Sequence, residues 1–200
     1  MQTFVPFESN FNQCAFVLDD NRLNKQRSEC QIILKTLLGL YDIETGKGWP
    51  HHPATRMWLG YEPALLGYSI AIALEWETRG HADTTLEWFV NLADDKGFDI
   101  ENYEMPHWWG GGIHASHRSN LMEKNPEYYL RWWTDKPGMN YVWPSGKERL
   151  TPRIPLKSEL WAWIKTGEGT TIGDGADYFG ITPLEFIRIR DQKNTDRKGA

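Results

Sequence analysis

Apolar positions recur at helical spacing along most of this chain. From Leu18 to Leu38 they fall near the 3.6-residue period and define one face of a helix: Leu18, Cys30, Ile33, Leu34, Leu37 and Leu38. Asp19 or Asp20 can cap the first turn, and Gly39 is placed to end the helix. The pattern therefore predicts a long helix over residues 18–38, around which we expect the rest of the chain to be organised.

The same period predicts further helices downstream. Pro63 suits a first helical turn, so a strongly apolar helix is expected from near Glu62 to about Arg79. Its apolar residues make it the expected central core helix: Leu65, Leu66, Ile70, Ala73 and Leu74. Shorter helices are expected just after Ala54, over roughly 84–96, over about 114–123, and in an aromatic segment after Pro126.

The remaining segments show no strand period. Residues 1–17 indicate an extended entry segment, and residues 41–53 and 98–113 are loops rich in Gly and Pro. Residues 134–157 contain four prolines and indicate an irregular, wrapping segment. The fold class is therefore mainly α.

Helix signals return after Ser158, and the spacing around Ile181–Thr182 resembles the turn of a helix–turn–helix. We expect a compact helical domain with long loops over residues 1–147. Residues 148–200 form a small C-terminal helical appendage, which either packs as such or contacts DNA.

Composition narrows the class of protein. No apolar run approaches the ~18–20 residues of a membrane span, and residues 1–4 lack the basic start and apolar core of a signal peptide. The two cysteines, Cys14 and Cys30, fit a reducing compartment, so we expect a cytoplasmic protein without membrane contacts. The net charge of -5 argues against coating nucleic acid by bulk charge, yet leaves room for a local basic groove. The 11 tryptophans supply flat side chains that can stack on bases.

A cluster of charge lies in the first long helix. Arg22, Lys25 and Arg27 are followed at once by Glu29, and the spacing places Arg22, Lys25 and Glu29 near one helix face. Two interpretations stay open on these residues alone. One is a solvated face with ordinary salt bridges. The other is a phosphate clamp around a carboxylate that carries chemistry.

The six histidines do not form a metal signature. His114 and His117 are three residues apart and His51 and His52 are adjacent, but no HExxH or CxxC motif accompanies them. The glycine run at 110–112 matches no nucleotide-binding motif, and no serine stands in a nucleophile elbow. We expect no metal and no cofactor.

Five motifs occur in order along residues 1–145: LDDNRLNKQRSE, GWPHHPATRMW, TRGHADT, HASHRSNLMEKNPEYY and YVWPS. In combination they resemble the pyrimidine-dimer DNA glycosylase family of the phage endonuclease V type, and most closely an actinobacterial and phage branch that begins MQTF. The resemblance implies a compact, mostly helical fold that kinks duplex DNA and exposes a damaged base. We expect a monomer that binds double-stranded DNA.

The resemblance also implies roles for individual residues. Family enzymes attack the sugar C1′ with the α-amine of the N-terminal residue, here Met1, and the Schiff base so formed supports AP-lyase activity. A helical glutamate assists and aligns with Glu29, and Arg22 aligns with a basic residue near the sugar. Arg27 stands beside the position of a phosphate-binding arginine, which is Ser28 in this chain.

The implied nucleophile suits neutral pH. An α-amine has an ordinary pKa of about 7.7, against about 10.4 for lysine, so far more of it is unprotonated near neutrality. Gln2 departs from the family pattern because it is too large for efficient removal of Met1. The free amine would then stand on Met1 itself, one residue further out.

We expect one DNA-facing surface rimmed by tryptophans, to which the resemblance adds two tyrosines. Its residues are Lys25, Arg27, His51, His52, Arg56, Trp49, Trp108, Trp109, His114, His117, Arg118, Tyr128 and Tyr129. In the competing interpretation, the tryptophans belong to the hydrophobic core and the histidines have only structural roles. The predicted function is excision of a pyrimidine dimer or another damaged or modified base from DNA. The alternatives are a non-catalytic nucleic-acid-binding protein of the same fold and an enzyme acting on a modified nucleotide.

Overall fold

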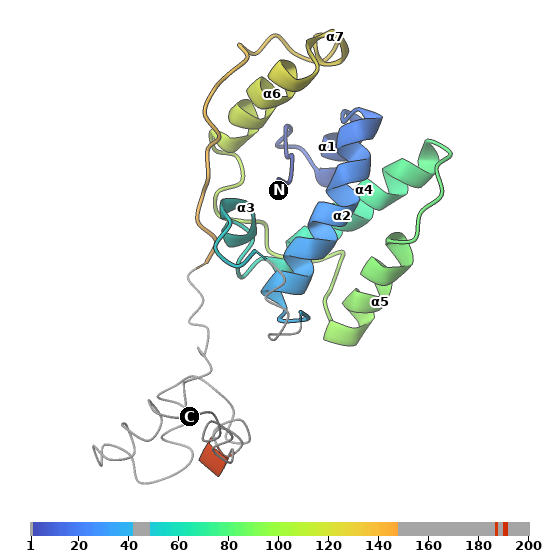
Figure 1. The fold of residues 1–200 in the computed structure, drawn as a ribbon, viewed down its shortest axis with the longest axis vertical. Helices are drawn as coiled ribbons and strands as arrows, with labels where there is room; N and C mark the ends of the chain where they lie inside the picture. Colours follow the sequence, from blue (N-terminus) through green and yellow to red (C-terminus); the bar gives the residue numbers. More distant parts are fainter. Residues whose placement is uncertain (1, 42–48, 148–186, 188–189, 192–200) are drawn as a thin grey trace, which may run out of the picture. The chain divides into compact units, whose positions relative to one another are not determined.

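The computed structural model describes residues 2–41, 49–147, 187, 190 and 191. The chain divides between Lys147 and Glu148 into two units, and everything below concerns the first. Its described residues contain no strand and form the following helices: α1 (Phe11–Phe16), α2 (Asp20–Leu37), α3 (Pro53–Arg56), α4 (Glu62–Thr78), α5 (Leu86–Lys96), α6 (Ile113–Lys124) and α7 (Pro126–Tyr129) (Figure 1). The mainly helical class is confirmed. The predicted helix–turn–helix around residues 181–182 lies outside the described residues.

The long first helix forms where its sequence signals place it. The Asp19 side chain caps α2 by accepting the Arg22 backbone N–H at 3.0 Å, which satisfies one of the unpaired donors of the first turn. Gly39 follows the last turn with φ +64°, a left-handed conformation that suits glycine at a helix end. The predicted helix is therefore confirmed to within two residues at each end.

Helix α4 is the centre of the core, as predicted. It packs against α1, α2 and α5 (Figure 1). Residues around most of its circumference are buried. The placement of Leu74 in the core was wrong, because its side chain is 47% exposed. A helix packed on several sides buries no single stripe, so apolar character alone does not identify its few outward positions.

The expectation of an extended segment over residues 1–17 was wrong in its second half. Residues Phe11–Phe16 form α1, whose N-cap Asn10 accepts the Gln13 N–H at 2.8 Å. Phe11, Cys14 and Ala15 are buried beneath it. Six residues are too few to display a helical period, so only packing against α4 reveals this helix.

The irregular segment after α7 runs back along α6 toward α3 (Figure 1). The Met139 and Val142 backbone N–H groups donate to Ser119 and Ser116 of α6 at 2.9 and 3.2 Å. Gly146 then donates its N–H to the Arg56 carbonyl at 2.9 Å. This segment therefore joins the far end of the domain to α3.

Close packing at Gly146 leads to a first prediction. A Cβ atom there would clash with the carbonyl oxygens of Leu59 and Arg56, the second at 2.6 Å, and backbone cannot move aside cheaply. We expect Gly146→Ala to lower the free energy of unfolding by about 1–3 kcal/mol in a denaturant titration. Gly112→Ala is the control, because a Cβ there meets only Val142 at 4.0 Å. Equal stability of the two variants would contradict the prediction.

Candidate active site

The N-terminal segment lies buried against α2. The Gln2 backbone N–H donates to Glu29 Oε2 at 2.8 Å, and the Phe4 N–H donates to Gln26 Oε1 at 2.9 Å. Gln26 and Glu29 stand one helical turn apart, so their side chains meet alternate peptide groups of the extended segment. The carboxylate of Glu29 is thereby fixed at the nitrogen of residue 2.

Two histidines of α6 hold the same segment from the other side. The Val5 N–H donates to His117 Nδ1 at 2.9 Å, while His114 Nδ1 lies 2.6 Å from the Val5 carbonyl and donates to it. Burial lowers the pKa of His114, and it lowers the pKa of His117 to about 3. Both rings are therefore neutral at physiological pH and act as hydrogen-bonding partners of the backbone.

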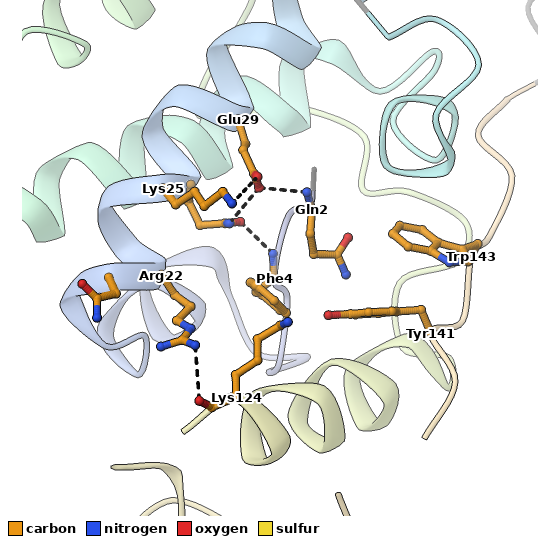
Figure 2. Close-up of a pocket in the computed structure, with 10 residues that line it drawn as sticks. Gln2, Phe4, Arg22, Lys25, Glu29, Lys124, Tyr141 and Trp143 are labelled. Carbon is orange, nitrogen blue, oxygen red and sulfur yellow. Dashed lines mark hydrogen bonds and ion pairs between the residues drawn. The ribbon is translucent and has the colours of Figure 1, made fainter. Parts of the chain in front are cut away.

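A pocket of about 480 Å³ opens beside this segment (Figure 2). The N-terminal segment, α2, the last residue of α6 and the segment after α7 all contribute to its wall. Its lining residues are Gln2, Phe4, Asn21, Arg22, Lys25, Gln26, Glu29, Lys124, Tyr141 and Trp143. The volume falls within the range of roughly 300–1,000 Å³ that is usual for small-molecule sites.

Three cations, Arg22, Lys25 and Lys124, line this pocket together with Glu29. Lys25 Nζ lies 3.9 Å from Glu29 Oε1, and Arg22 is held by Asp19 at 3.2 Å and by the Lys124 carbonyl at 3.3 Å. Glu29 is 8% exposed, whereas Lys25 and Lys124 are exposed. A buried carboxylate can stabilise developing positive charge and transfer protons, and exposed cations can bind phosphate.

The predicted residues of α2 come together only in part. Arg22, Lys25 and Glu29 line the pocket, in keeping with their helical spacing. Arg27 lies elsewhere: it pairs with Asp83 and stacks over Trp76 at 4.6 Å. Met1, the predicted nucleophile, lies outside the described residues.

The residues predicted from α6 and α7 do not join a shared DNA-facing surface with α2. His114 and His117 are buried, and Arg118 pairs with Asp135 at 2.9 Å. Tyr129 is buried and its hydroxyl accepts the Asp19 N–H at 3.2 Å, while the Tyr128 ring stacks under Arg131. These side chains hold the fold together instead.

The predicted aromatic residues of the two loops, with Arg56 of α3, divide into two groups. Trp108 is buried and donates to the Met57 carbonyl, and Trp109 packs on Phe11 and donates to the Glu8 carbonyl, both at 2.8 Å. The other group stays at the surface: Trp49, His51 and Arg56 are exposed and His52 is half-buried.

Sequence reasoning did not select several lining residues as site residues. Lys124, Tyr141 and Trp143 lie more than 90 positions from Glu29 in the chain, so no local spacing links them to it. The available signal was the motif YVWPS, which contains both aromatic residues. Likewise the opening MQTF contains Gln2 and Phe4.

Neither a membrane span nor a metal cluster occurs in the described part of the chain. Its helices are too short or too polar to cross a membrane. Residues 2–41 and 49–147, with the three described tail positions, contain no group of three or more His, Cys, Asp or Glu placed to hold a metal ion.

The neutral His117 leads to a prediction about pH. Its pKa is about 3 when folded against an ordinary 6.5, so the unfolded chain binds the proton more tightly. The stability that this difference contributes is present above pH 6.5 and is lost progressively as the pH falls from 6.5 toward 3. We expect His117→Asn, which keeps an acceptor for the Val5 N–H, to reduce this loss in denaturant titrations at pH 7 and pH 4.5.

His51→Asn is the matched control, because His51 is exposed. That variant should lose stability between the two pH values as the unmodified protein does. An unchanged loss in His117→Asn would show that the ring is not held neutral by burial.

Comparison with known proteins finds a similarity that covers the pocket residues from the N-terminal segment and α2. The family model described as pyrimidine dimer DNA glycosylase matches residues 1–88, which include the N-terminal segment and all of α2. No curated protein and no solved structure matches the chain. The resemblance seen in the motifs is therefore confirmed over residues 1–88, which are similar to the pyrimidine dimer DNA glycosylase family.

Proposed function

We propose that this protein excises a damaged base, with pyrimidine dimers as the first candidate, from double-stranded DNA at the Glu29 pocket. The observation that carries the proposal is the 2.8 Å hydrogen bond from the Gln2 nitrogen to Glu29 Oε2 at the wall of that pocket. It fixes a buried carboxylate next to the start of the chain. The family match over the same residues supports this assignment.

Glu29 is proposed to act on the sugar. When the bond from C1′ to the base nitrogen breaks, the base takes the electron pair and positive charge develops on the sugar. A carboxylate held in a largely buried position stabilises that charge more strongly than one in water. Glu29 is 8% exposed and accepts hydrogen bonds from Gln2 and Gln26, so its position is set before the substrate arrives.

The proposed nucleophile is the α-amine of Met1. Covalent geometry alone places this amine three bonds from the Gln2 nitrogen, which contacts Glu29. The amine nitrogen forms a bond to C1′ and releases a proton, and the base departs with the glycosidic electron pair and gains a proton. The sugar ring then opens: the C1′–O4′ bond breaks, O4′ takes its electron pair and a proton, and the nitrogen lone pair forms the C=N bond of a protonated Schiff base with C1′.

Arg22, Lys25 and Lys124 are proposed to bind the phosphates that flank the damaged nucleotide. They surround the pocket while the chain as a whole carries a net charge of -5. DNA affinity then depends on a few local contacts, so we place the duplex over this pocket.

Cleavage of the glycosidic bond in irradiated duplex DNA tests the function. We expect the full chain to cut one glycosidic bond of each pyrimidine dimer, which leaves an abasic site or a strand break while the freed base stays joined to its neighbour in the dimer. Glu29→Gln should lower the rate by about 100-fold or more with DNA affinity retained, because the amide cannot stabilise the cationic sugar or transfer its proton. Glu77→Gln, at an exposed position of α4, is the control for loss of one charge.

If the unmodified protein leaves neither abasic sites nor strand breaks in irradiated duplex DNA, the proposal is overturned. An unchanged rate in Glu29→Gln would remove this carboxylate from the reaction and leave it as a hydrogen-bonding partner of Gln2.

Borohydride trapping tests the amine. With a duplex that contains an abasic site, reduction of the Schiff base should leave a covalent adduct on the first residue, located by mass spectrometry of the digested protein. Acetylation of the α-amine should abolish the adduct. Base release without any adduct would instead assign attack on C1′ to water.

A further inference from the structure

A run of four aromatic rings leads from the protein surface into the pocket. Trp49 meets His52 edge to face at 6.1 Å between ring centroids, and His52 meets Trp143 in the same way at 6.0 Å. Trp143 then meets Tyr141 at 5.2 Å with a tilt of 36°. Trp49 is 58% exposed and Trp143 is 37% exposed, so the run stays open to solvent.

Tyr141 and Trp143 face the charged side of the pocket. Figure 2 shows Arg22, Lys25 and Glu29 projecting from α2 on one side, and the two aromatic side chains on the other, with Gln2 and Phe4 between them. The pocket therefore has a polar wall and an aromatic wall. The first suits phosphate and sugar, and the second suits a flat apolar ring.

The polar atoms of these two aromatic residues are available to a ligand. Trp58, Trp108 and Trp109 each donate their indole N–H to a protein oxygen at 2.8 Å. By contrast, within the part of the chain that the structure describes, the Trp143 indole and the Tyr141 hydroxyl make no hydrogen bond to the protein. Burial raises the pKa of Tyr141 to about 12, so its hydroxyl keeps its proton and can donate.

We propose that Tyr141 and Trp143 form a stacking wall for a single base extruded from the duplex, with the Tyr141 hydroxyl donating to an acceptor on the edge of that base. This inference rests on the proposed function and adds the residues that would select a damaged site over intact duplex. Both residues lie outside the region matched by the family model.

The position of the wall is set by contacts away from the pocket. The Val142 N–H is tied to Ser116 of α6, and Gly146 packs on the backbone after α3, so Trp143 lies on a segment held at both ends. His52 is likewise fixed, because its Nδ1 caps α3 by accepting the Ala54 N–H at 3.1 Å. A wall placed before binding loses little conformational freedom when a base stacks on it.

The test is selective binding by the full-length chain. The two probes are a duplex with one tetrahydrofuran abasic analogue, which leaves the base opposite it unpaired and free to be extruded, and an intact duplex of the same sequence. We expect Trp143→Ala to weaken binding of the first by roughly 5- to 100-fold, the range that loss of one base–aromatic stack gives, with affinity for the intact duplex unchanged. Trp143→Phe should retain much of the affinity for the abasic duplex that Trp143→Ala loses. Tyr141→Phe keeps the ring, so its affinity for the abasic duplex should fall only by the contribution of the hydroxyl hydrogen bond.

Trp132→Ala is the matched control. Trp132 is 36% exposed, close to the value for Trp143, but its ring packs on Phe16 and does not line the pocket. A second readout is the salt dependence of binding, whose slope should stay unchanged in Trp143→Ala because no charge is lost.

Two results would overturn the inference. One is unchanged selectivity in Trp143→Ala, and the other is an equal loss of affinity for both duplexes, which would place the aromatic wall against intact DNA. These outcomes are distinct from failure of the proposed function, in which the unmodified protein neither cuts glycosidic bonds in irradiated DNA nor prefers the abasic duplex.

Discussion

Burial of the N-terminal segment is the constraint on which the pocket depends. Buried backbone N–H and C=O groups must be paired, and residues 2–5 have no neighbouring strand among the described residues to pair with. Side chains therefore supply the partners: Glu29 for the Gln2 nitrogen, Gln26 for Phe4, and the two histidines of α6 for Val5. The carboxylate proposed to act in catalysis is thus also part of the structural solution for the start of the chain.

The distribution of charge depends on which cations form ion pairs inside the domain. Arg27 and Arg118, which appeared free to bind DNA, are used inside the domain, where each meets a carboxylate. Arg22, Lys25 and Lys124 remain around the pocket. A chain with a net charge of -5 can in this way present a small cationic rim at one place without being basic as a whole.

A second long-range element completes the pocket. The irregular segment after α7 returns along α6 and reaches α3, where only a glycine at position 146 fits against the backbone. This path carries Tyr141 and Trp143 to the side opposite α2. The pocket therefore joins the first thirty residues to residues more than a hundred positions later. Its aromatic wall depends on correct closure of the whole domain.

The sequence by itself determined the features that arise between near neighbours in the chain. The 3.6-residue period and the caps located α2 and α4, and the helical spacing placed Arg22, Lys25 and Glu29 on one side. Tertiary structure decided the rest. It buried Trp108 and the α6 histidines, formed the short α1, and brought Lys124, Tyr141 and Trp143 to Glu29. Local periodicity reports which face of one element is apolar, but which residues meet across elements depends on contacts between distant parts of the chain.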